Sequence, residues 1–330
     1  MKALGKIICA ITLAVSLAHP LESAQRAQLA YVSNERDGTV TVIDTATDEV
    51  VSSIRVGGRP RGIHLSADGK RLYAALTYRS DRREGAADQI AALDTATGQV
   101  VARYDVGTDP EQFAISRNGA RLYTSNEDAG TASVTDLRLN RVIATLVVGV
   151  EPEGVAISPD GRWVYVTSES SSNVTVIDTR TNKVRATFPV GARPRAAAFS
   201  PDGRRAYVTA ENGGTVAVVR TRDHTVIDTI HLPRDQVKPM GVVVSPDGRR
   251  VYVANGRGNN VAAIDARTNK LAALIPVSER PWGIAITRDG KKVYTANGLS
   301  NDVAVIDTDT NRVIKIIKAG DGPWGVVISR

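Results

Sequence analysis

The chain is short of the residue types on which many enzymes and disulfide-rich proteins depend. In 330 residues it has a single cysteine, Cys9, and four histidines: His19, His64, His224 and His231. Because Cys9 lies in an N-terminal apolar stretch, the rest of the chain excludes disulfides, thiolate catalysis, cysteine metal sites and c-type haem attachment. The histidines lack the HxxxH spacing of a zinc-binding helix, and no GxSxG nucleophile motif occurs. The sequence therefore contains no familiar catalytic motif, and His64 is expected to be packed or hydrogen-bonded.

Long uncharged apolar runs are also absent beyond the N-terminus. Lys2 and Lys6 precede an apolar stretch at 7–18, the pattern of a secretory signal peptide. We predict a signal peptide at 1–18 with cleavage before His19, Ala24 being the other candidate, and a short segment at 19–27. The stretch is shorter than the roughly 20 residues of a spanning helix. We expect a periplasmic or secreted protein without a membrane contact after cleavage; an uncleaved anchor is the alternative.

Charge of one sign is not concentrated anywhere. The formal net charge is +7, and the basic residues are spread along the chain without a block of like charges. A soluble basic surface accounts for this pattern better than a nucleic-acid footprint. We therefore expect no specific nucleic-acid partner and keep weak nonspecific binding as an alternative.

Phenylalanine and tryptophan are scarce, with three residues each, but tyrosine recurs at regular intervals. The tetrapeptide YVSN at Tyr31 returns in variant forms, and most of the intervals are 42 residues. A fixed period in the 40s is typical of a repeat architecture. The later units start at Tyr73, Tyr123, Tyr165, Tyr207, Tyr252 and Tyr294.

Each unit reads as four short strands. In one unit, 154–158 alternates small and branched residues, a Pro-Asp-Gly turn follows, and 163–167 is rich in aromatic and β-branched residues. Further strands are expected at 174–178 and 183–190. Seven such units predict an all-β fold: a seven-bladed β-propeller over 28–330. The chain opens on a second-type strand and ends on a first-type strand, so the C-terminal strand should complete the first blade.

One set of loops differs from blade to blade. The connection between blades carries a proline, and the seven connections should ring one mouth of the central channel. The residue after each proline should point into the channel: Arg61, Glu111, Glu153, Arg195, Met240, Trp282 and Trp324. The residues before six of the prolines form a predicted secondary rim: Arg59, Asp109, Glu151, Arg193, Lys238 and Arg280.

These side chains allow two interpretations, which are compatible. Arg61 and Arg195 could pair with Glu111 and Glu153 as a salt-bridged rim. The same groups could form a ligand pocket, in which arginines bind carboxylates and the tryptophans stack a flat ring. Glutamates recur in loops on the same face and are expected to be solvated: Glu35, Glu127, Glu169 and Glu211. The long loop at 77–89 could cover the mouth or meet a partner. We expect no metal site.

The repeat resembles a known family. The unit PxGVAxSPDGxxVYVxNxxxxxVxVIDTxT is similar to that of the bacterial YVTN-type β-propellers. The chain looks most like the exported propellers associated with pyrroloquinoline quinone (PQQ)-dependent catabolism. The segments that carry this resemblance are YVSNERDGTVTVID, VGVEPEGVAISPDGRWVYVTSE and RPWGIAITRDGKKVYTANGLSNDVAVID. Relatives of the fold include lactonases and the haem d1 domain of nitrite reductase, although the histidines are poorly placed for haem.

The resemblance implies a pathway and a compartment rather than a reaction. We therefore expect a monomeric, non-enzymatic periplasmic binding or accessory propeller, which serves quinoprotein alcohol oxidation and binds its ligand or partner at the channel mouth. We expect that no cofactor is required. PQQ or another small anionic aromatic molecule is a possible ligand. A quinoprotein dehydrogenase or cytochrome c is a possible partner. The alternative from another class is a hydrolase or lactonase that uses the same funnel.

Overall fold

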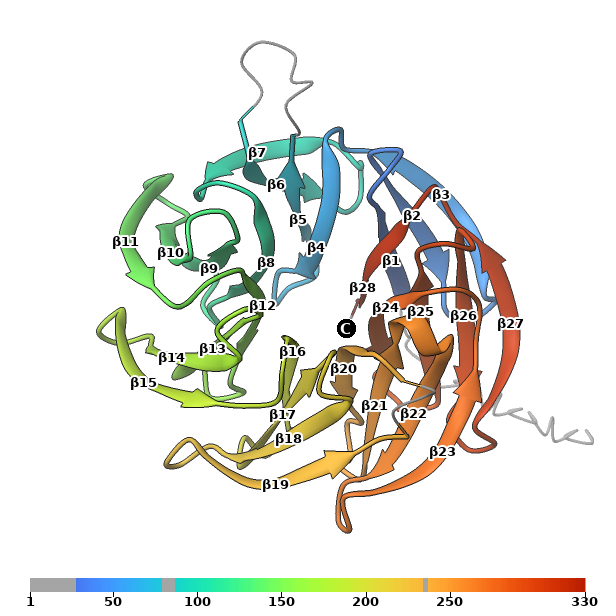
Figure 1. Ribbon diagram of the computed structural model, residues 1–330. Coiled ribbons are helices and arrows are strands. Elements are labelled where there is room, and N and C mark those ends of the chain that lie inside the picture. The colour runs from blue at the N-terminus through green and yellow to red at the C-terminus, as the bar shows by residue number, and fades with distance from the viewer. Residues whose placement is uncertain (1–27, 79–86, 234–236, 330) are drawn as a thin grey trace, which may run out of the picture.

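Seven four-stranded antiparallel sheets surround a central axis in the computed structural model, which describes residues 28–78, 87–233 and 237–329 (Figure 1). The predicted seven-bladed β-propeller is confirmed. The predicted signal peptide lies outside the described residues. Among the described residues, no helix has the length and apolar character needed to cross a bilayer.

Four strands make up each blade, from an inner strand at the axis to an outer strand at the rim. Blade 1 contains β28 (Pro323–Ile328), β1 (Leu29–Asn34), β2 (Thr39–Asp44) and β3 (Glu49–Arg55). Blade 2 contains β4 (Arg59–Leu65), β5 (Arg71–Thr77), β6 (Gln89–Asp94) and β7 (Val100–Asp105). Blade 3 contains β8 (Pro110–Ile115), β9 (Arg121–Asn126), β10 (Thr131–Asp136) and β11 (Arg141–Val147).

The remaining blades follow in the same order. Blade 4 contains β12 (Pro152–Ile157), β13 (Trp163–Ser168), β14 (Asn173–Asp178) and β15 (Lys183–Pro189). Blade 5 contains β16 (Pro194–Phe199), β17 (Arg205–Ala210), β18 (Thr215–Arg220) and β19 (Thr225–His231). Blade 6 contains β20 (Pro239–Val244), β21 (Arg250–Asn255), β22 (Asn260–Asp265) and β23 (Lys270–Pro276), with a 3₁₀ turn, η1 (Gly256–Gly258). Blade 7 contains β24 (Pro281–Ile286), β25 (Lys292–Asn297), β26 (Asp302–Asp307) and β27 (Arg312–Lys318).

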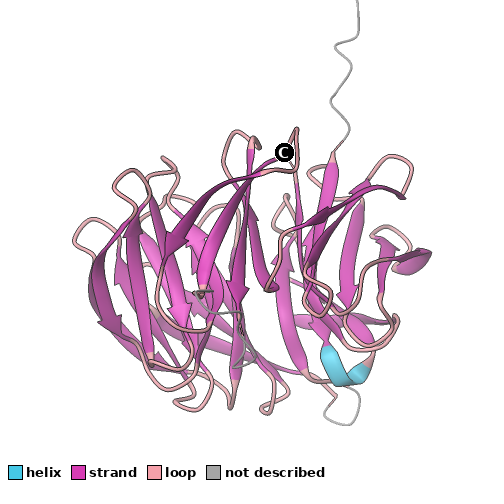
Figure 2. Ribbon diagram, turned by 90° about the horizontal axis from the view of Figure 1, so that it is seen from above, coloured by secondary structure: helices cyan, strands magenta, loops and turns pink. Residues whose placement is uncertain are grey.

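The strands run between two faces, and the loops gather at these faces (Figure 2). The face that carries η1 also carries the seven prolines that begin the inner strands, and we call it the mouth face. The opposite face carries the Pro-Asp-Gly turns. In blade 4, the amide of Gly161 donates to the carbonyl of Ser158 at 2.8 Å and Gly161 has a φ of 75°, as the turn prediction requires.

Both faces of each blade are buried against neighbouring blades, because the second and third strands carry valine, alanine and isoleucine on both sides. In most blades the inner strands come so close at the axis that a side chain has no room. A Cβ added to Gly283 would lie 2.5 Å from the carbonyl oxygen of Trp324 in the next blade. The same substitution at Gly325 would bring Cβ within 2.9 Å of the carbonyl oxygen of Arg61. This confirms that the smallest residues are needed where the blades converge.

Some of the repeat tyrosines join one blade to the next. Each hydroxyl reaches a residue of left-handed conformation in the third turn of the following blade. Tyr165 shares a hydrogen bond of 2.8 Å with Nδ1 of His224, and Tyr123 donates to Asn182 at 3.2 Å. Tyr294 donates in the same way to Asp48, across the seam between the last blade and the first. These three tyrosines therefore hold neighbouring blades together and do not line the cavities at the mouth face.

The ring closes in blade 1, where β28 pairs with β1 in antiparallel register (Figure 1). The amide of Gly325 donates to the hydroxyl of Ser33 at 2.9 Å, and this hydroxyl donates to the carbonyl of Arg61 at 2.6 Å. The C-terminal strand thus bonds both to its own blade and, through Ser33, to blade 2.

Below the mouth the axial channel is lined by few polar side chains. A cavity of about 160 Å³ is lined mainly by glycine, alanine, valine and isoleucine of the inner strands, with His64 and Gln112 as its two polar side chains. His64 packs edge-on against Phe113, with ring centroids 5.0 Å apart. Burial lowers the pKa of His64 to about 4, although a hydrogen bond to Gln112 opposes the shift. His64 is therefore a packed, neutral histidine, as expected.

Removing the closing strand should destabilise the whole ring. Deletion of 322–330 exposes the edge of β1 and opens the seam between blades. We expect the melting temperature to fall by at least about 10 °C in scanning calorimetry. A truncated chain that melts at the temperature of the full chain would contradict closure by β28.

Acid should destabilise the protein through His64. A histidine whose folded-state pKa lies below its unfolded value of about 6.5 stabilises the fold above pH 6.5, and this contribution is lost as the pH falls towards 4. Between pH 7 and pH 4.5, His64→Gln should therefore lose less of its free energy of unfolding than the wild type, by at most about 3 kcal/mol. Urea titrations at both pH values measure this. His231→Gln, at an exposed site on β19, is the control and should behave as the wild type.

Candidate functional site

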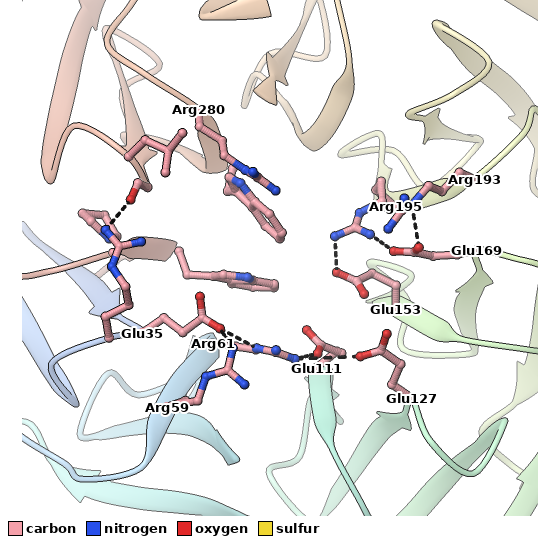
Figure 3. Close-up of a pocket in the computed structure, with 17 residues that line it drawn as sticks. Glu35, Arg59, Arg61, Glu111, Glu127, Glu153, Glu169, Arg193, Arg195 and Arg280 are labelled. Carbon is pink, nitrogen blue, oxygen red and sulfur yellow. Dashed lines mark hydrogen bonds and ion pairs between the residues drawn. The ribbon is translucent and has the colours of Figure 1, made fainter. Parts of the chain in front are cut away.

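A polar cavity of about 320 Å³ opens on the mouth face, at the lower end of the range for small-molecule sites of about 300–1,000 Å³. We call it the mouth pocket. Its charged side chains alternate in sign around one part of the wall, and two tryptophans form another part (Figure 3). The charged lining residues are Glu35, Arg36, Arg59, Arg61, Glu111, Glu127, Glu153, Glu169, Arg193, Arg195 and Arg280.

Most of the residues predicted to face the channel line the mouth pocket. The inner-strand residues that do so are Arg61, Glu111, Glu153, Arg195, Trp282 and Trp324. Met240 lines two smaller adjoining cavities instead. Of the predicted secondary rim, Arg59, Arg193 and Arg280 line the pocket. Asp109, Glu151 and Lys238 are not among its lining residues.

Arg61 is the centre of one ionic cluster. Its Nε donates to Glu35 at 3.0 Å, and its Nη1 contacts Glu111 and lies 3.5 Å from Asp109. Burial disfavours the charge on Arg61, but Glu35 and Asp109 outweigh this effect and raise its pKa. The predicted pairing of Arg61 with Glu111 is therefore present, as part of a larger group.

Arg195 is the centre of a second cluster and is almost fully buried. Its Nη2 donates to Glu153 at 2.8 Å, and its Nη1 contacts Glu169. Arg193 adds a second cation, with Nε at 2.6 Å from Glu169 and 3.2 Å from Glu211. The predicted pairing of Arg195 with Glu153 is also present.

The aromatic wall lies next to this second cluster. The rings of Trp282 and Trp324 have centroids 5.5 Å apart and are tilted by 45°. The guanidinium of Arg195 lies 5.1 Å from the Trp282 ring centroid, and that of Arg280 lies 5.0 Å from it. Trp282 is thus shared by two cations, which fixes its orientation.

The loop glutamates were predicted wrongly as solvated groups. Glu169 and Glu211 are 5% and 9% exposed, and both pair with arginines of blade 5. Glu35 and Glu127 line the mouth pocket. Their constant offset of four residues from the repeat tyrosine placed them on the correct face, but their pairing depends on arginines of a neighbouring blade.

Three carboxylates come together in blade 3, although the sequence predicted no metal site. Oxygen atoms of Asp109, Glu111 and Glu127 lie within 4.8 Å of one another. Carboxylates of this kind suit hard cations such as Mg²⁺ and Ca²⁺. Here Nη1 of Arg61 already reaches all three, its distance to Glu127 being 3.9 Å. The guanidinium therefore supplies the positive charge that a metal ion would supply.

Two carboxyl groups of the pocket are poised to hold a proton more readily than usual. Burial, and next the negative charge of Asp109, raise the pKa of Glu127. Burial also raises the pKa of Glu153, against the attraction of Arg195. Of the two, Glu127 has the more accessible side chain, 30% exposed against 7% for Glu153. Glu127 can therefore exchange a proton with a water or ligand in the pocket.

Loss of the buried cation at 195 should be costly. Arg195→Met leaves Glu153 and Glu169 buried without their main counterion, so we expect the free energy of unfolding to fall by about 3–5 kcal/mol. Chemical denaturation measures this. Adding Glu153→Gln and Glu169→Gln removes the uncompensated charges and should restore part of the loss; a triple variant no more stable than the single one would contradict this account.

Comparison with known proteins supports one family. The family model described as "Lactonase, 7-bladed beta-propeller" matches residues 19–141 and 178–319. A second model, "Cytochrome D1 heme domain", matches only 83–210. Among curated proteins, the uncharacterized protein YncE of Salmonella typhi is 38% identical over 82 residues, which are 25% of this chain and 23% of that protein. The chain therefore spans about a quarter of the length of this relative.

Solved structures share the fold at low identity. The periplasmic gluconolactonase PpgL of Pseudomonas aeruginosa superposes with a TM-score of 0.78 at 20% identity, over 92% of this chain and 99% of that one. A candidate 6-phosphogluconolactonase of Bacteroides fragilis gives a TM-score of 0.77 at 21% identity, over 93% and 99%. Hydrazine synthase of Kuenenia stuttgartiensis gives 0.72 at 22% identity, over 82% and 95%. At these identities the likeness shows the fold alone.

These comparisons correct the function predicted from the sequence. The prediction of a non-enzymatic accessory propeller for quinoprotein alcohol oxidation is wrong, because the family match points to lactonase-type propellers, which were the stated alternative. The finer resemblance to the PQQ-associated propellers finds no counterpart among them. The chain belongs to the family of lactonase-type seven-bladed β-propellers.

Proposed function

We propose that the protein hydrolyses a lactone, the cyclic ester of a hydroxy acid, in the mouth pocket. The observation that carries this proposal is Glu127, an accessible carboxyl group of raised pKa, beside the guanidinium of Arg61 in the pocket of a lactonase-family propeller. The names of two fold neighbours, a gluconolactonase and a candidate 6-phosphogluconolactonase, suggest a sugar-acid lactone as the substrate class.

The groups needed for ester hydrolysis are present. Glu127 removes a proton from water as the water oxygen attacks the carbonyl carbon, since a base works best with a pKa near the working pH. Arg61 stabilises the negative charge that develops on the carbonyl oxygen. The C–O bond of the ring then breaks, the ring oxygen takes up the proton, and the product is the open hydroxy acid. Trp282 and Trp324 offer an aromatic surface to the C–H face of the substrate ring.

Loss of the carboxylate at 127 should remove most of the activity. With glucono-lactone as substrate, the ring opening of which releases acid, we expect Glu127→Gln to lower kcat by about 100-fold or more. The wild-type kcat should rise with pH through a pKa above the usual glutamate value of about 4.3, because only the deprotonated base is active. A pH-stat measures both.

The matched control lies next to Glu127 in the same loop. Asp128→Asn also removes one negative charge, from an exposed side chain that does not line the pocket, and should leave kcat unchanged. Wild-type activity no higher than the uncatalysed rate with several sugar-acid lactones would reject the proposal. So would a Glu127→Gln variant as active as the wild type.

We also propose that the protein is exported. The basic and apolar pattern at 2–18 is that of a signal peptide, and one fold neighbour is named as a periplasmic enzyme. The predicted anionic aromatic ligand, the predicted protein partners and the monomeric state stay predictions.

A further inference from the structure

Arg280 differs from the other arginines of the mouth pocket. Arg59, Arg61, Arg193 and Arg195 pair with pocket glutamates, and Arg36 pairs with Asp321 at 2.8 Å. Among the residues that the structure describes, no carboxylate lies within 4.0 Å of the Arg280 guanidinium, which makes neither an ion pair nor a hydrogen bond. Figure 3 shows it away from Glu111 and Glu127, with no dashed line to a carboxylate. Its charge is available to a ligand.

The surroundings of Arg280 are electrostatically unfavourable to a cation. Burial, and then the positive charges of Arg257 and Arg195, lower the pKa of Arg280, and the negative charges of Glu211 and Glu35 only partly oppose this shift. The side chain is also half-buried against Trp282. An anion placed beside Arg280 would offset the like-charge repulsion and the cost of burial together.

The backbone at Arg280 also carries strain. Its φ of 58° is left-handed, and it precedes Pro281, where a left-handed conformation is rarer still for a residue with a side chain. Gly322 occupies the equivalent position of blade 1 with a φ of 70°, so glycine fits this site without strain. Asp109, Glu151 and Arg193 share this conformation before their prolines, so the turn between blades imposes it and Arg280 adopts it at a cost that glycine avoids.

A small side cavity joins Arg280 to Arg257. It measures about 60 Å³, enough for about two waters, and its lining includes Arg257, Arg280, Met240 and Trp282. Glu211 also lines it, and this carboxylate is paired with Arg193 at 3.2 Å. Arg193, Arg195, Arg280 and Trp282 line both this cavity and the mouth pocket. Arg257 comes from η1 and is exposed, so it can approach a group bound over Trp282. The space suits a single oxyanion group rather than a sugar ring.

We propose that Arg280 and Arg257 form an oxyanion-binding subsite beside Trp282, which takes a carboxylate or phosphate group attached to the ligand of the mouth pocket. The inference rests on the proposed function only in naming that ligand as a lactone. It assigns the substrate's anionic group to the side of the pocket formed by blades 6 and 7, away from Glu127 and Arg61. Arg280 can bind such a group through two parallel N–H donors.

The test measures anion binding without turnover. Inorganic phosphate and succinate are titrated separately, at constant ionic strength, while tryptophan fluorescence is followed. We expect a saturable response to at least one of them, and at least a tenfold weaker affinity in Arg280→Gln and a smaller loss in Arg257→Gln. Arg204→Gln, an exposed arginine on the opposite face, is the charge-matched control and should bind as the wild type. If only one of the two anions binds, that result identifies the oxyanion that the subsite prefers.

Two results would overturn the inference: no saturable response to either anion, or an Arg280→Gln variant that binds as the wild type does. Arg280→Gly separates binding from folding. It should lose the anion while melting no lower than the wild type, because it relieves the left-handed strain; a clear fall in its melting temperature would instead give Arg280 a structural role. Anion binding that persists in a protein without lactonase activity would reject the proposed function and leave the subsite intact.

Discussion

The rest of the structure depends on the close approach of inner strands at the axis. A Cβ atom on Gly283 or Gly325 would collide with a backbone carbonyl of the inner strand in the next blade. Neither glycine can therefore be replaced by a residue with a side chain. This contact fixes the height and rotation of β24 and β28 against their neighbours. The residue just before each of these glycines is therefore held at the mouth at a defined height, as seen for Trp282 and Trp324.

Pairing explains how so many charges can be gathered at the mouth. A buried carboxylate such as Glu169 would be costly alone, but Arg193 and Arg195 compensate it within contact distance. The pairs neutralise most of the lining and also immobilise the side chains that form it. Two groups are less fully compensated than the others: Glu127, which can exchange a proton, and Arg280, which lacks a counterion among the described residues.

Much of the fold and part of the site could be predicted from the sequence. The repeat places Arg61 and Arg195 at equivalent positions of their blades, directly after the inner-strand proline. Which residues lie next to each of them therefore follows from the register of the repeat alone. The depth of Glu169 could not be predicted in this way, since it depends on arginines that a different blade supplies. The meeting of Asp109 with Glu127 likewise depends on how the loops of one blade bend towards each other.

The reaction was the least predictable part, and the reason is physical. The repeat unit encodes strands, turns and blade contacts, which are the same in propellers with different chemistry. The residues that decide function are single substitutions within that unit. Arg280 illustrates this: the blade around it is regular, and Arg193 has the same left-handed backbone at the equivalent position, but Arg193 is paired and Arg280 lacks a counterion among the described residues.

The closing strand has a consequence for biosynthesis. Pro323 and Trp324 line the pocket but are made long after Glu35 and Arg61, which lie on the same wall. A ribosome or translocon therefore releases the first blade with a missing strand, and its neighbours must wait for the C-terminal segment to return. The mouth pocket is therefore incomplete until 323–328 have been made and have paired with β1. A chain that stops before Pro323 cannot form it.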